Sequence, residues 1–311
     1  MTYQLEAALA DWTGRDFALV TSSGTSALRA CLYSLNLKPS ALVAVQAYNY
    51  PSVVHSVHSV GLRPVLLDVD PDELVLLPAE VERALALGVD AVIITHMWGW
   101  LGKTCDIAKL CKESNIPLIE DASRAYGAQI AEGRAGQFGD LAFFSMNDSK
   151  VLGAGEGGFL VTDDLKLACR AASLGLPLHP LNNAPQKGWE LGCGEKHVIH
   201  PAGLRMALRL LSNLEDRISA SQCRFENLMK ELNGSGIITG NGIRGAWKDV
   251  AINISVSKLP DHLVRCVKNE FPTNNITTWA PQKWLAGRHR FHGANVGQRL
   301  RVLENICSYN P

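Results

Sequence analysis

The feature that most constrains the fold is a repeated alternation of short apolar runs with longer helix-compatible segments in the first half of the chain. The apolar runs are continuous rather than alternating in polarity, which indicates strands buried on both faces of a sheet. Most are separated by ten or more residues, which is enough for the crossovers that parallel strands need. We therefore predict an α/β domain with a mainly parallel sheet sandwiched by helices. Its strands are expected at residues 17–22, 42–46, 64–70, 91–95, 117–121, 141–146 and 158–163.

The second part of the chain has a different pattern, which follows a stretch rich in Pro, Gly and Asn. Residues 202–232 carry Leu and Met at three- and four-residue spacing, which is typical of a packed connecting helix. A weak β-like run at 249–256 and a helical pattern at 260–271 follow. Because 311 residues exceed one small core, we predict a large domain at residues 1–204 and a smaller α+β domain at 205–311.

Composition excludes several classes of partner. Thirty Lys and Arg balance thirty Asp and Glu, so no net field attracts nucleic acid or an anionic membrane. The eight cysteines show no CxxC pair and no Cys/His metal spacing, which is typical of reduced thiols. The amino-terminal residues lack a secretory apolar region, and the longest apolar runs are too short to span a bilayer. We expect a cytoplasmic protein without metal, nucleic-acid or membrane partners.

The stretch FFSMNDSKVLGAGEGGFLVTDD, residues 143–164, combines Lys150 with Gly153, Gly155 and Gly158. This glycine spacing matches a dinucleotide-binding fingerprint, which requires a strand, a glycine turn and then a helix. The residues after Gly158 are β-branched and apolar, and they indicate a strand instead. We therefore favour the interpretation in which the glycines let a loop turn sharply around Lys150.

Lys150 is expected at the surface unless a pocket encloses it. In an enclosed pocket the pKa of its ammonium group falls, and the neutral amine can form a Schiff base with an aldehyde. A phosphate cup is expected at Gly24, Thr25 and Ser26, where N–H groups at a helix amino terminus lie beside hydroxyl donors. Ordinary N-capping by Ser23 or Thr25 is the alternative explanation of this motif.

Other candidate residues follow the ends of predicted strands, where open α/β sheets bind ligands. Asp121 could pair with the nitrogen of a pyridine ring and keep that nitrogen protonated, or it could cap the following segment. Tyr50 could stack on the same ring, or it could be a packing residue. His96 in THMWGW could lie near this site or be a structural histidine.

Taken in order and spacing, these blocks resemble the DegT/DnrJ/EryC1/StrS aminotransferases, a branch of the pyridoxal-phosphate (PLP) fold type I proteins. The resemblance covers about residues 3–216 and is carried by SGTSAL, PVLLDVDPD, THMWGW, IEDASRAYGA, FGDLAFFSMNDSK and GEGGFLVTDD. It implies that Lys150 forms the Schiff base with PLP, that Asp121 pairs with the pyridine nitrogen and that Tyr50 stacks on the ring. It also implies phosphate contacts from Gly24, Thr25 and Ser145.

The resemblance also implies a homodimer with its active sites at the subunit interface, as in other members of the family. The resemblance implies that GEKHVIHP, residues 194–201, reaches the partner's active site with Lys196 at the phosphate. The chain departs from the family at Arg124, where most members have Gln or His, and at Val198, which replaces a usual Arg. Most members also have Asn where Lys196 stands. Arg124 would face the phenolic oxygen of the cofactor or a substrate carboxylate, and it cannot carry protons.

The leading functional hypothesis is a PLP-dependent aminotransferase that moves an amino group from an amino-acid donor to a sugar-like or small keto acceptor in a biosynthetic pathway. Sugar dehydratases of the family carry His at the lysine position, and this chain keeps Lys150. Arg124 suits a bidentate grip on an α-carboxylate, which motivates elimination, racemisation, decarboxylation or carbon–carbon bond formation on an amino acid as an alternative. Compared with full-length sugar aminotransferases of the family, the sequence lacks the leading arm at the amino terminus and has a short carboxyl-terminal domain. These differences motivate a third hypothesis, which is a non-catalytic PLP-binding protein.

Overall fold

In the computed structural model, the seven predicted strands form a single sheet with the order β1-β9-β8-β5-β4-β2-β3. Strands β3, β2, β4, β5 and β8 are parallel, and β9 pairs antiparallel with both β8 and β1. The expected mainly parallel sheet is therefore confirmed. The strands are Phe17–Thr21 (β1), Leu42–Gln46 (β2), Arg63–Leu67 (β3), Ala91–Thr95 (β4), Leu118–Asp121 (β5), Leu141–Ser145 (β8) and Gly158–Thr162 (β9). The structure describes residues 1–70, 75–176, 179–183, 195–232, 250–253, 276–278 and 306–309.

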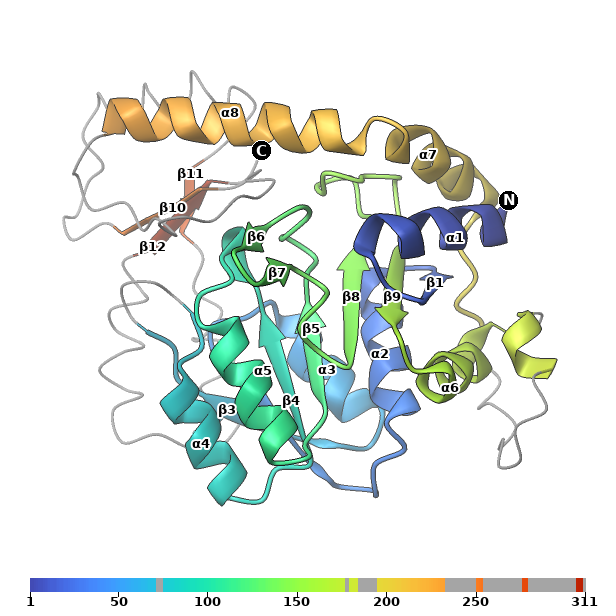
Figure 1. Ribbon diagram of the computed structural model, residues 1–311, viewed down its shortest axis with the longest axis vertical. Helices are drawn as coiled ribbons and strands as arrows, with labels where there is room; N and C mark the ends of the chain where they lie inside the picture. The colour runs from blue at the N-terminus through green and yellow to red at the C-terminus, as the bar shows by residue number, and fades with distance from the viewer. Residues whose placement is uncertain are drawn as a thin grey trace.

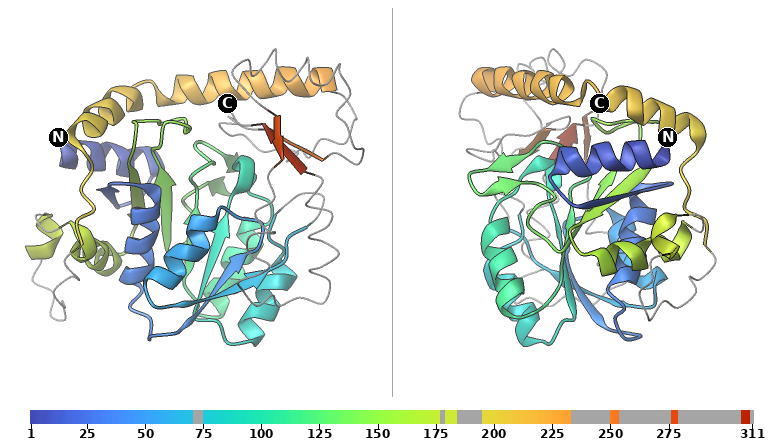
Figure 2. Two further views of the ribbon diagram at one scale, coloured as in Figure 1. Left: turned by 180° about the vertical axis from the view of Figure 1, so that it is seen from behind. Right: turned by 45° about the vertical axis from the view of Figure 1, so that its right-hand side comes forward.

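Helices cover both faces of this sheet (Figure 1, Figure 2). Helices α2, α3 and α6 pack on one face, while α4 and α5 pack on the other. Two short strands, β6 (Gln129–Ile130) and β7 (Gly133–Arg134), form a hairpin outside the main sheet. The helices of this region are Thr2–Thr13 (α1), Gly24–Ser34 (α2), Pro51–Ser59 (α3), Pro78–Ala86 (α4), Thr104–Glu113 (α5) and Leu165–Gly175 (α6).

Capping residues explain where several helices begin. Asp164 Oδ1 accepts the N–H groups of Lys166 at 2.6 Å and Leu167 at 3.1 Å, which satisfies the first turn of α6. Pro51 and Pro78 open α3 and α4, where the missing N–H of proline costs nothing. Helices α2 and α3 both follow the carboxyl ends of strands, so the loops before them meet at one edge of the sheet.

The interior is filled by residues of the central strands. Every residue of β4, β5 and β9 is buried, as their continuous apolar runs predict. Phe144 of β8 stacks on Phe159 of β9 with ring centroids 4.6 Å apart. Leu5 and Leu9 of α1 join the same hydrophobic cluster. The ends of these strands are therefore held by packing on both sides.

The connecting helix predicted at residues 202–232 is instead two helices, α7 (Pro201–Leu211) and α8 (Leu214–Leu232). Between them, Ser212 Oγ donates to the Arg209 carbonyl at 2.8 Å, a local bond of the kind that competes with helix continuation. The prediction of one continuous helix is wrong because the apolar spacing continues across this break. Helix α7 and the first turns of α8 pack on the large domain through Leu204, Ala207, Leu214 and Ile218.

Beyond α8, the described residues form an antiparallel three-stranded sheet with the order β10-β12-β11. These strands are Val250–Asn253 (β10), Ile276–Thr278 (β11) and Ile306–Tyr309 (β12). Strand β10 lies within the β-like run predicted at 249–256, whereas the helix predicted at 260–271 lies outside the described residues. The domain boundary after residue 204 stays a prediction.

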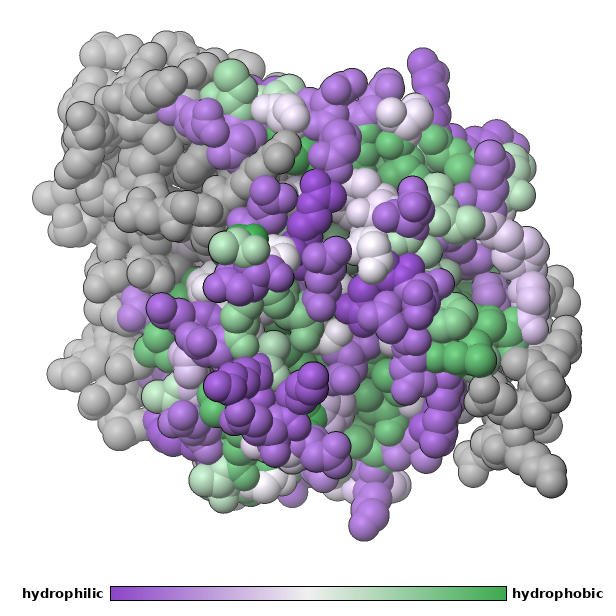
Figure 3. Space-filling model, in the orientation of Figure 1, coloured by the Kyte–Doolittle hydropathy of each residue, from purple (hydrophilic) through white to green (hydrophobic). Residues whose placement is uncertain are grey.

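The described surface is mixed in polarity. Hydrophilic residues cover much of the face shown in Figure 3, with smaller hydrophobic groups between them. Isolated apolar side chains of this kind are normal on a folded domain. Among the described residues, no helix is both long enough and apolar enough to cross a membrane.

Candidate active site

The carboxyl ends of β4, β5 and β8 and the first turn of α2 line one pocket of about 440 Å³. Open α/β sheets bind ligands at this edge. Ser26 and Lys196, two of the predicted site residues, lie outside its lining. The other predicted site residues do line it, namely Gly24, Thr25, Tyr50, Asp121, Arg124, Ser145 and Lys150.

Helix α2 presents its amino terminus to this pocket. Ser23 is the N-cap, and its Oγ accepts the N–H of Ser26 at 3.0 Å. The hydroxyl of Ser26 lies 3.0 Å from Ser22 Oγ and 2.9 Å from Ser23 Oγ, so it belongs to the cap. Gly24 and Thr25 form the first turn, whose N–H groups have no partner within a helix and therefore suit an anion. Capping by Ser23 and an anion site at the first turn are thus compatible.

Close packing explains the glycines beside α2. A Cβ at Gly24 would lie 2.8 Å from Ser145 Cβ, and a Cβ at Gly158 would clash with the carbonyl group of Ser23. Strands β8 and β9 can approach the start of α2 only because these positions carry no side chain. Ser145 ends β8 at the pocket, and Tyr126 holds it there by donating to the Ser145 carbonyl at 2.8 Å.

The loop between β8 and β9 carries Lys150 into the pocket lining. Gly155 has a φ of 82°, a left-handed conformation that favours glycine. A Cβ at Gly153 would lie 2.7 Å from the carbonyl oxygen of Asp148. Strand β9 begins at Gly158, so the predicted strand after the glycines is confirmed. Gly153 and Gly155 therefore serve the tight turn that presents Lys150, whereas Gly158 lets β9 approach Ser23.

Asp121 ends β5 with its carboxylate in the pocket. Its Oδ1 accepts the N–H of Ser123 at 3.0 Å. Burial raises the pKa of the Asp121 carboxyl, and the hydrogen bonds from Ser123 and the charges of Lys150 and His96 oppose that rise only in part. An ionised carboxylate here would gain from a cationic group on a ligand.

His96 follows β4, and its Nε2 lies 2.8 Å from Glu120 Oε2. The Glu120 carboxylate also accepts the N–H groups of Gly136, Phe138 and Gly139, so we assign it as ionised, with His96 Nε2 as donor. His96 Nδ1 is buried and has no hydrogen-bond partner among the described residues, and the side chain lines the pocket. A buried unpaired atom of this kind is suited to a ligand group.

Tyr50 and Arg124 add an aromatic ring and a cation to the lining. Asn49 fixes the loop that carries Tyr50, because it donates to Thr95 Oγ1 at 2.9 Å and accepts the Tyr50 N–H at 2.7 Å. The Tyr50 side chain remains 60% exposed, so its ring is accessible. Burial lowers the pKa of the Arg124 guanidinium, and the nearby Asp121 opposes that shift.

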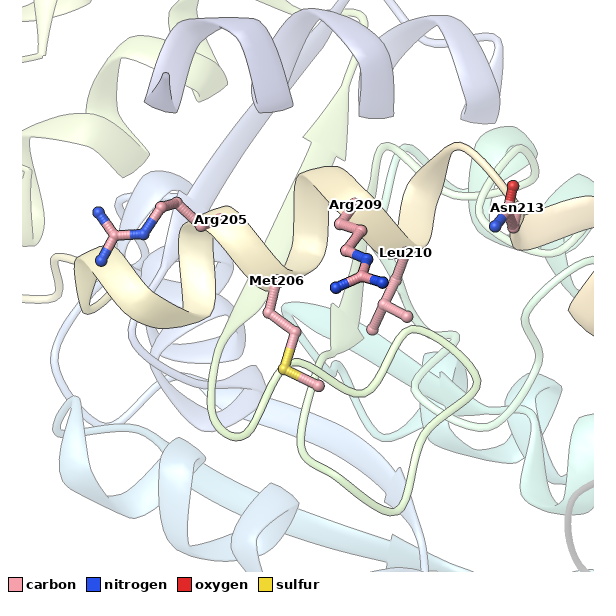
Figure 4. A pocket seen from close by; sticks show the side chains of 5 residues that line it. All are labelled: Arg205, Met206, Arg209, Leu210 and Asn213. Carbon is pink, nitrogen blue, oxygen red and sulfur yellow. The ribbon is translucent and has the colours of Figure 1, made fainter.

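Lys196 lies in the extended segment before α7, and its side chain is exposed. Helix α7 itself lines a second pocket, of about 520 Å³. Met206 and Leu210 extend from the same side of this helix, with Arg209 between them (Figure 4). The residues that line the second pocket are Arg205, Met206, Arg209, Leu210 and Asn213.

Sequence reasoning missed Asn147 and Ser149 and left His96 undecided. Asn147 donates to Glu156 Oε1 at 2.8 Å, and its Oδ1 accepts the Ser149 N–H at 3.1 Å. Asn147, Ser149 and Glu156 all lie in this loop and line the pocket. Their position in the same glycine-rich loop as Lys150 is the signal that could have found them. For His96, the signal is a histidine directly after a buried strand.

Two kinds of sequence comparison identify relatives. The profile of the DegT/DnrJ/EryC1/StrS aminotransferase family matches residues 1–281. Protein MosB of Rhizobium meliloti is 29% identical over 241 residues, which cover 73% of this chain and 47% of that protein. The L-glutamine:2-deoxy-scyllo-inosose aminotransferase of Micromonospora echinospora is 30% identical over 248 residues, which cover 79% of this chain and 58% of that enzyme. The chain thus spans about half the length of these curated relatives.

Comparison with solved structures identifies a chain of the same fold. The GDP-4-keto-6-deoxy-D-mannose-3-dehydratase of E. coli, solved with bound hydrated PLP, has a TM-score of 0.85 at 18% sequence identity. The similarity covers 99% of this chain and 86% of that chain. At this low identity the comparison shows the shared fold, so the predicted fold type I architecture is confirmed.

Proposed function

This chain belongs to the DegT/DnrJ/EryC1/StrS aminotransferase family, and we propose that it is a PLP-dependent aminotransferase. It moves an amino group from an amino-acid donor to a keto acceptor. The observation that carries the proposal is one pocket lined by Lys150, Asp121 and the first turn of α2. Together they supply an amine, a carboxylate and an anion site, which are the groups that PLP needs from a protein.

The lining residues fit PLP group by group. The N–H groups of Gly24 and Thr25, together with the Ser145 hydroxyl, would hold the phosphate. The Asp121 carboxylate would pair with the protonated pyridine nitrogen, and this pairing would offset the burial that raises the pKa of Asp121. Tyr50 would stack on the ring. When bound, PLP supplies an electron sink for negative charge at the substrate carbon.

Lys150 has two roles in this proposal. Its amine would hold the cofactor covalently in the resting enzyme, and after a donor displaces it, the same amine would move the proton of the donor's α-carbon. The positive charge of Lys150 acts on the Asp121 carboxyl, and both residues line the same pocket. Lysine at this position favours transamination over the dehydration that family members with His perform.

The proposal extends to a homodimer in which Lys196 contacts the phosphate in the partner's pocket. Val198, two residues after Lys196, and Met206 on α7 are each 48% exposed, and Tyr50 is 60% exposed. An interface between two copies would cover them and would bring a cation to the pocket.

We propose a polyhydroxylated, sugar-like keto acceptor, with glutamine or glutamate as the donor, in a biosynthetic pathway of the cytoplasm. The relative from Micromonospora echinospora is named an L-glutamine:2-deoxy-scyllo-inosose aminotransferase. Ser52, Asn147 and Ser149 line the pocket as neutral polar groups, which suit hydroxyl groups of a substrate. Five cysteines are free thiols, as expected in a reducing compartment, namely Cys31, Cys105, Cys111, Cys169 and Cys223.

Reconstitution with PLP tests the proposal. The wild-type protein should acquire the visible absorbance of lysine-bound PLP, and borohydride reduction followed by peptide mass spectrometry should locate the adduct at Lys150. Lys150→Ala should lose the adduct and all turnover. Lys109→Ala, which changes a 75% exposed lysine on α5, should keep both. Added glutamine or glutamate should convert the bound cofactor to its amine form, and a protein that never takes up PLP contradicts the proposal.

Arg124 favours a second candidate, which is PLP chemistry on an amino acid other than transamination. Its guanidinium lines the same pocket, and a planar cation suits two-point binding of an α-carboxylate. The donor titration separates the candidates. If PLP binds to Lys150 and no donor yields the amine form, elimination, racemisation, decarboxylation or carbon–carbon bond formation replaces transamination.

A further inference from the structure

We propose that Arg29, Glu195 and His197 form a positioning cluster that presents Lys196 to the phosphate of PLP bound by the partner subunit. The inference rests on the proposed function, which supplies the cofactor and the dimer. It gives a role to three ionisable residues that lie outside the pocket lining. Lys196 is the residue that would bind, and the cluster would act through it.

The cluster ties the segment before α7 to helix α2. Arg29 of α2 donates from Nη2 to Glu195 Oε1 at 2.5 Å. His197 Nε2 forms a hydrogen bond with the other carboxylate oxygen, Glu195 Oε2. The side chains of Arg29, Glu195 and His197 are 25%, 29% and 11% exposed. Partial removal from water strengthens such contacts relative to an ion pair on the open surface.

The residues that follow Glu195 are anchored as well. The backbone N–H of His197 donates to the Gly175 carbonyl at 2.8 Å. Gly175 has no room for a Cβ because the His197 ring occupies that position at the end of α6. Ile199 is only 4% exposed and joins the hydrophobic cluster of the large domain. The segment is therefore fixed at three alternate positions, Glu195, His197 and Ile199.

Alternation along the segment directs Lys196 away from its own subunit. His197 and Ile199 are buried and Glu195 is half-buried, whereas Lys196 and Val198 are exposed. Successive side chains of an extended chain point to opposite sides, so fixing residues 195 and 197 fixes the opposite direction of Lys196. Both oxygens of Glu195 bind other side chains, which keeps this acid from neutralising the adjacent lysine.

The sign of one measurement separates positioning from simple electrostatics. Removal of Glu195 deletes a negative charge beside Lys196, and Coulomb's law alone predicts tighter phosphate binding. Positioning predicts the reverse, because Lys196 loses the anchor that holds its backbone. A residue that acts only through Lys196 also loses its effect once Lys196 is gone.

The experiment is a double-mutant cycle on the full chain, in which absorbance titration gives the dissociation constant of PLP. Lys196→Ala should raise this constant about tenfold, as expected for a lost hydrogen bond to a charged group. Glu195→Ala should raise it about fivefold, and Arg29→Met should have the same effect. The double variant Glu195→Ala/Lys196→Ala should bind PLP as weakly as Lys196→Ala alone and no more weakly.

Glu215→Ala is the matched control. The Glu215 carboxylate accepts the Trp12 indole N–H at 2.8 Å and lies 3.6 Å from Arg134, outside the cluster, so its loss should leave the dissociation constant unchanged. Melting temperature and light scattering of every variant show whether folding or the dimer is lost. If Glu195→Ala does not fold, the cycle of Arg29→Met with Lys196→Ala carries the test by its lack of additivity, because loss of the Arg29 charge would weaken phosphate binding by Coulomb's law as well.

The outcomes separate the two proposals. Wild-type protein that binds no PLP contradicts the proposed function and the cluster together. A wild-type protein that binds PLP and is weakened by Lys196→Ala upholds the proposed function. If Glu195→Ala and Arg29→Met then leave PLP binding unchanged or tighten it, or if their effects add to that of Lys196→Ala, the positioning cluster is wrong by itself.

Discussion

The two faces of β5 carry adjacent buried acids in opposite electrostatic surroundings. Glu120 and Asp121 are consecutive, so their side chains point to opposite sides of the strand. Burial raises the pKa of the Glu120 carboxyl, but hydrogen bonds from His96 and from backbone N–H groups outweigh it and leave that pKa lowered. Burial also raises the pKa of Asp121, and there the hydrogen bonds from Ser123 do not offset it.

The difference teaches which buried charge supports the fold and which one is available for a ligand. The Glu120 carboxylate accepts several hydrogen bonds from groups within the protein. Arg15 is another buried charged residue whose partners all lie within the protein. Arg15 binds Asp163 at 3.0 Å and also donates to three backbone carbonyls. At Asp121, burial outweighs the hydrogen bonds from Ser123 and the charges of Lys150 and His96, so a further cationic group on a ligand would stabilise the ionised carboxylate. Buried groups whose pKa is shifted in this way are typical of functional sites.

The largest effect should come from Asp121→Asn. An amide cannot hold a protonated pyridine nitrogen by charge, so kcat of the aminotransferase should fall about 10³-fold, as expected when a preorganised electrostatic group is lost. Steady-state kinetics with a saturating donor measures this. Asp90→Asn is the control, because Asp90 accepts the Leu42 N–H at 2.8 Å at the other edge of the sheet. If the variant kept activity within about tenfold of wild type, Asp121 would not contribute to catalysis as proposed.

On the other face of β5, substitution of Glu120 should lower the stability of the protein. Glu120→Gln replaces an acceptor that binds four donors by an amide whose own N–H₂ faces them, so the free energy of unfolding should fall by about 3 kcal/mol. Urea denaturation measures this. Glu113→Gln, at a 61% exposed ion pair with Lys109, should change it by about 0.5 kcal/mol or less. If Glu120→Gln and Glu113→Gln lowered the free energy of unfolding equally, Glu120 would not have the structural role assigned to it.

Low pH should remove the contribution of the Glu120 carboxylate to the free energy of unfolding. A carboxyl whose pKa is lower in the folded state stabilises the fold above its unfolded pKa, and this contribution is lost as pH falls through the folded pKa. Below the ordinary value of 4.5, the wild-type free energy of unfolding should therefore fall by up to about 1.4 kcal/mol per pH unit more steeply than that of Glu120→Gln. Denaturation at a series of acid pH values tests it, and parallel curves would refute this assignment.

The smallest effect is a gain in stability on the pocket face. The raised pKa of Asp121 means that its ionised form costs stability, a cost that appears as pH rises through the unfolded pKa and is complete above the folded one. Asp121→Asn should therefore raise the free energy of unfolding of the PLP-free protein by about 1 kcal/mol at neutral pH. The melting temperature without PLP measures this. A melting temperature lower than that of wild type would show that the carboxylate is structural after all.

Much of the site could be predicted because its chemistry depends on residue types at strand ends. Continuous apolar runs locate the buried strands, and Asp121 and Ser145 stand where two of them finish. The break between α7 and α8 could not be predicted, because the apolar spacing continues across Ser212 and apolar residues on both sides of the break pack on one hydrophobic cluster. The state of His96 could not be predicted either, because its partner Glu120 lies on another strand.

By itself, the sequence determined the α/β alternation, the glycine turn around Lys150 and the chemistry available to the Lys150–Asp121 pair. Only the tertiary structure decided that the pKa of Glu120 is lowered while that of the adjacent Asp121 is raised, and that the lysine at position 196 points outward. Apolar periodicity and turn preferences are local properties that can be read along the chain. The pKa of a buried carboxyl depends on donors and charges from distant segments, and those meet only when the chain folds.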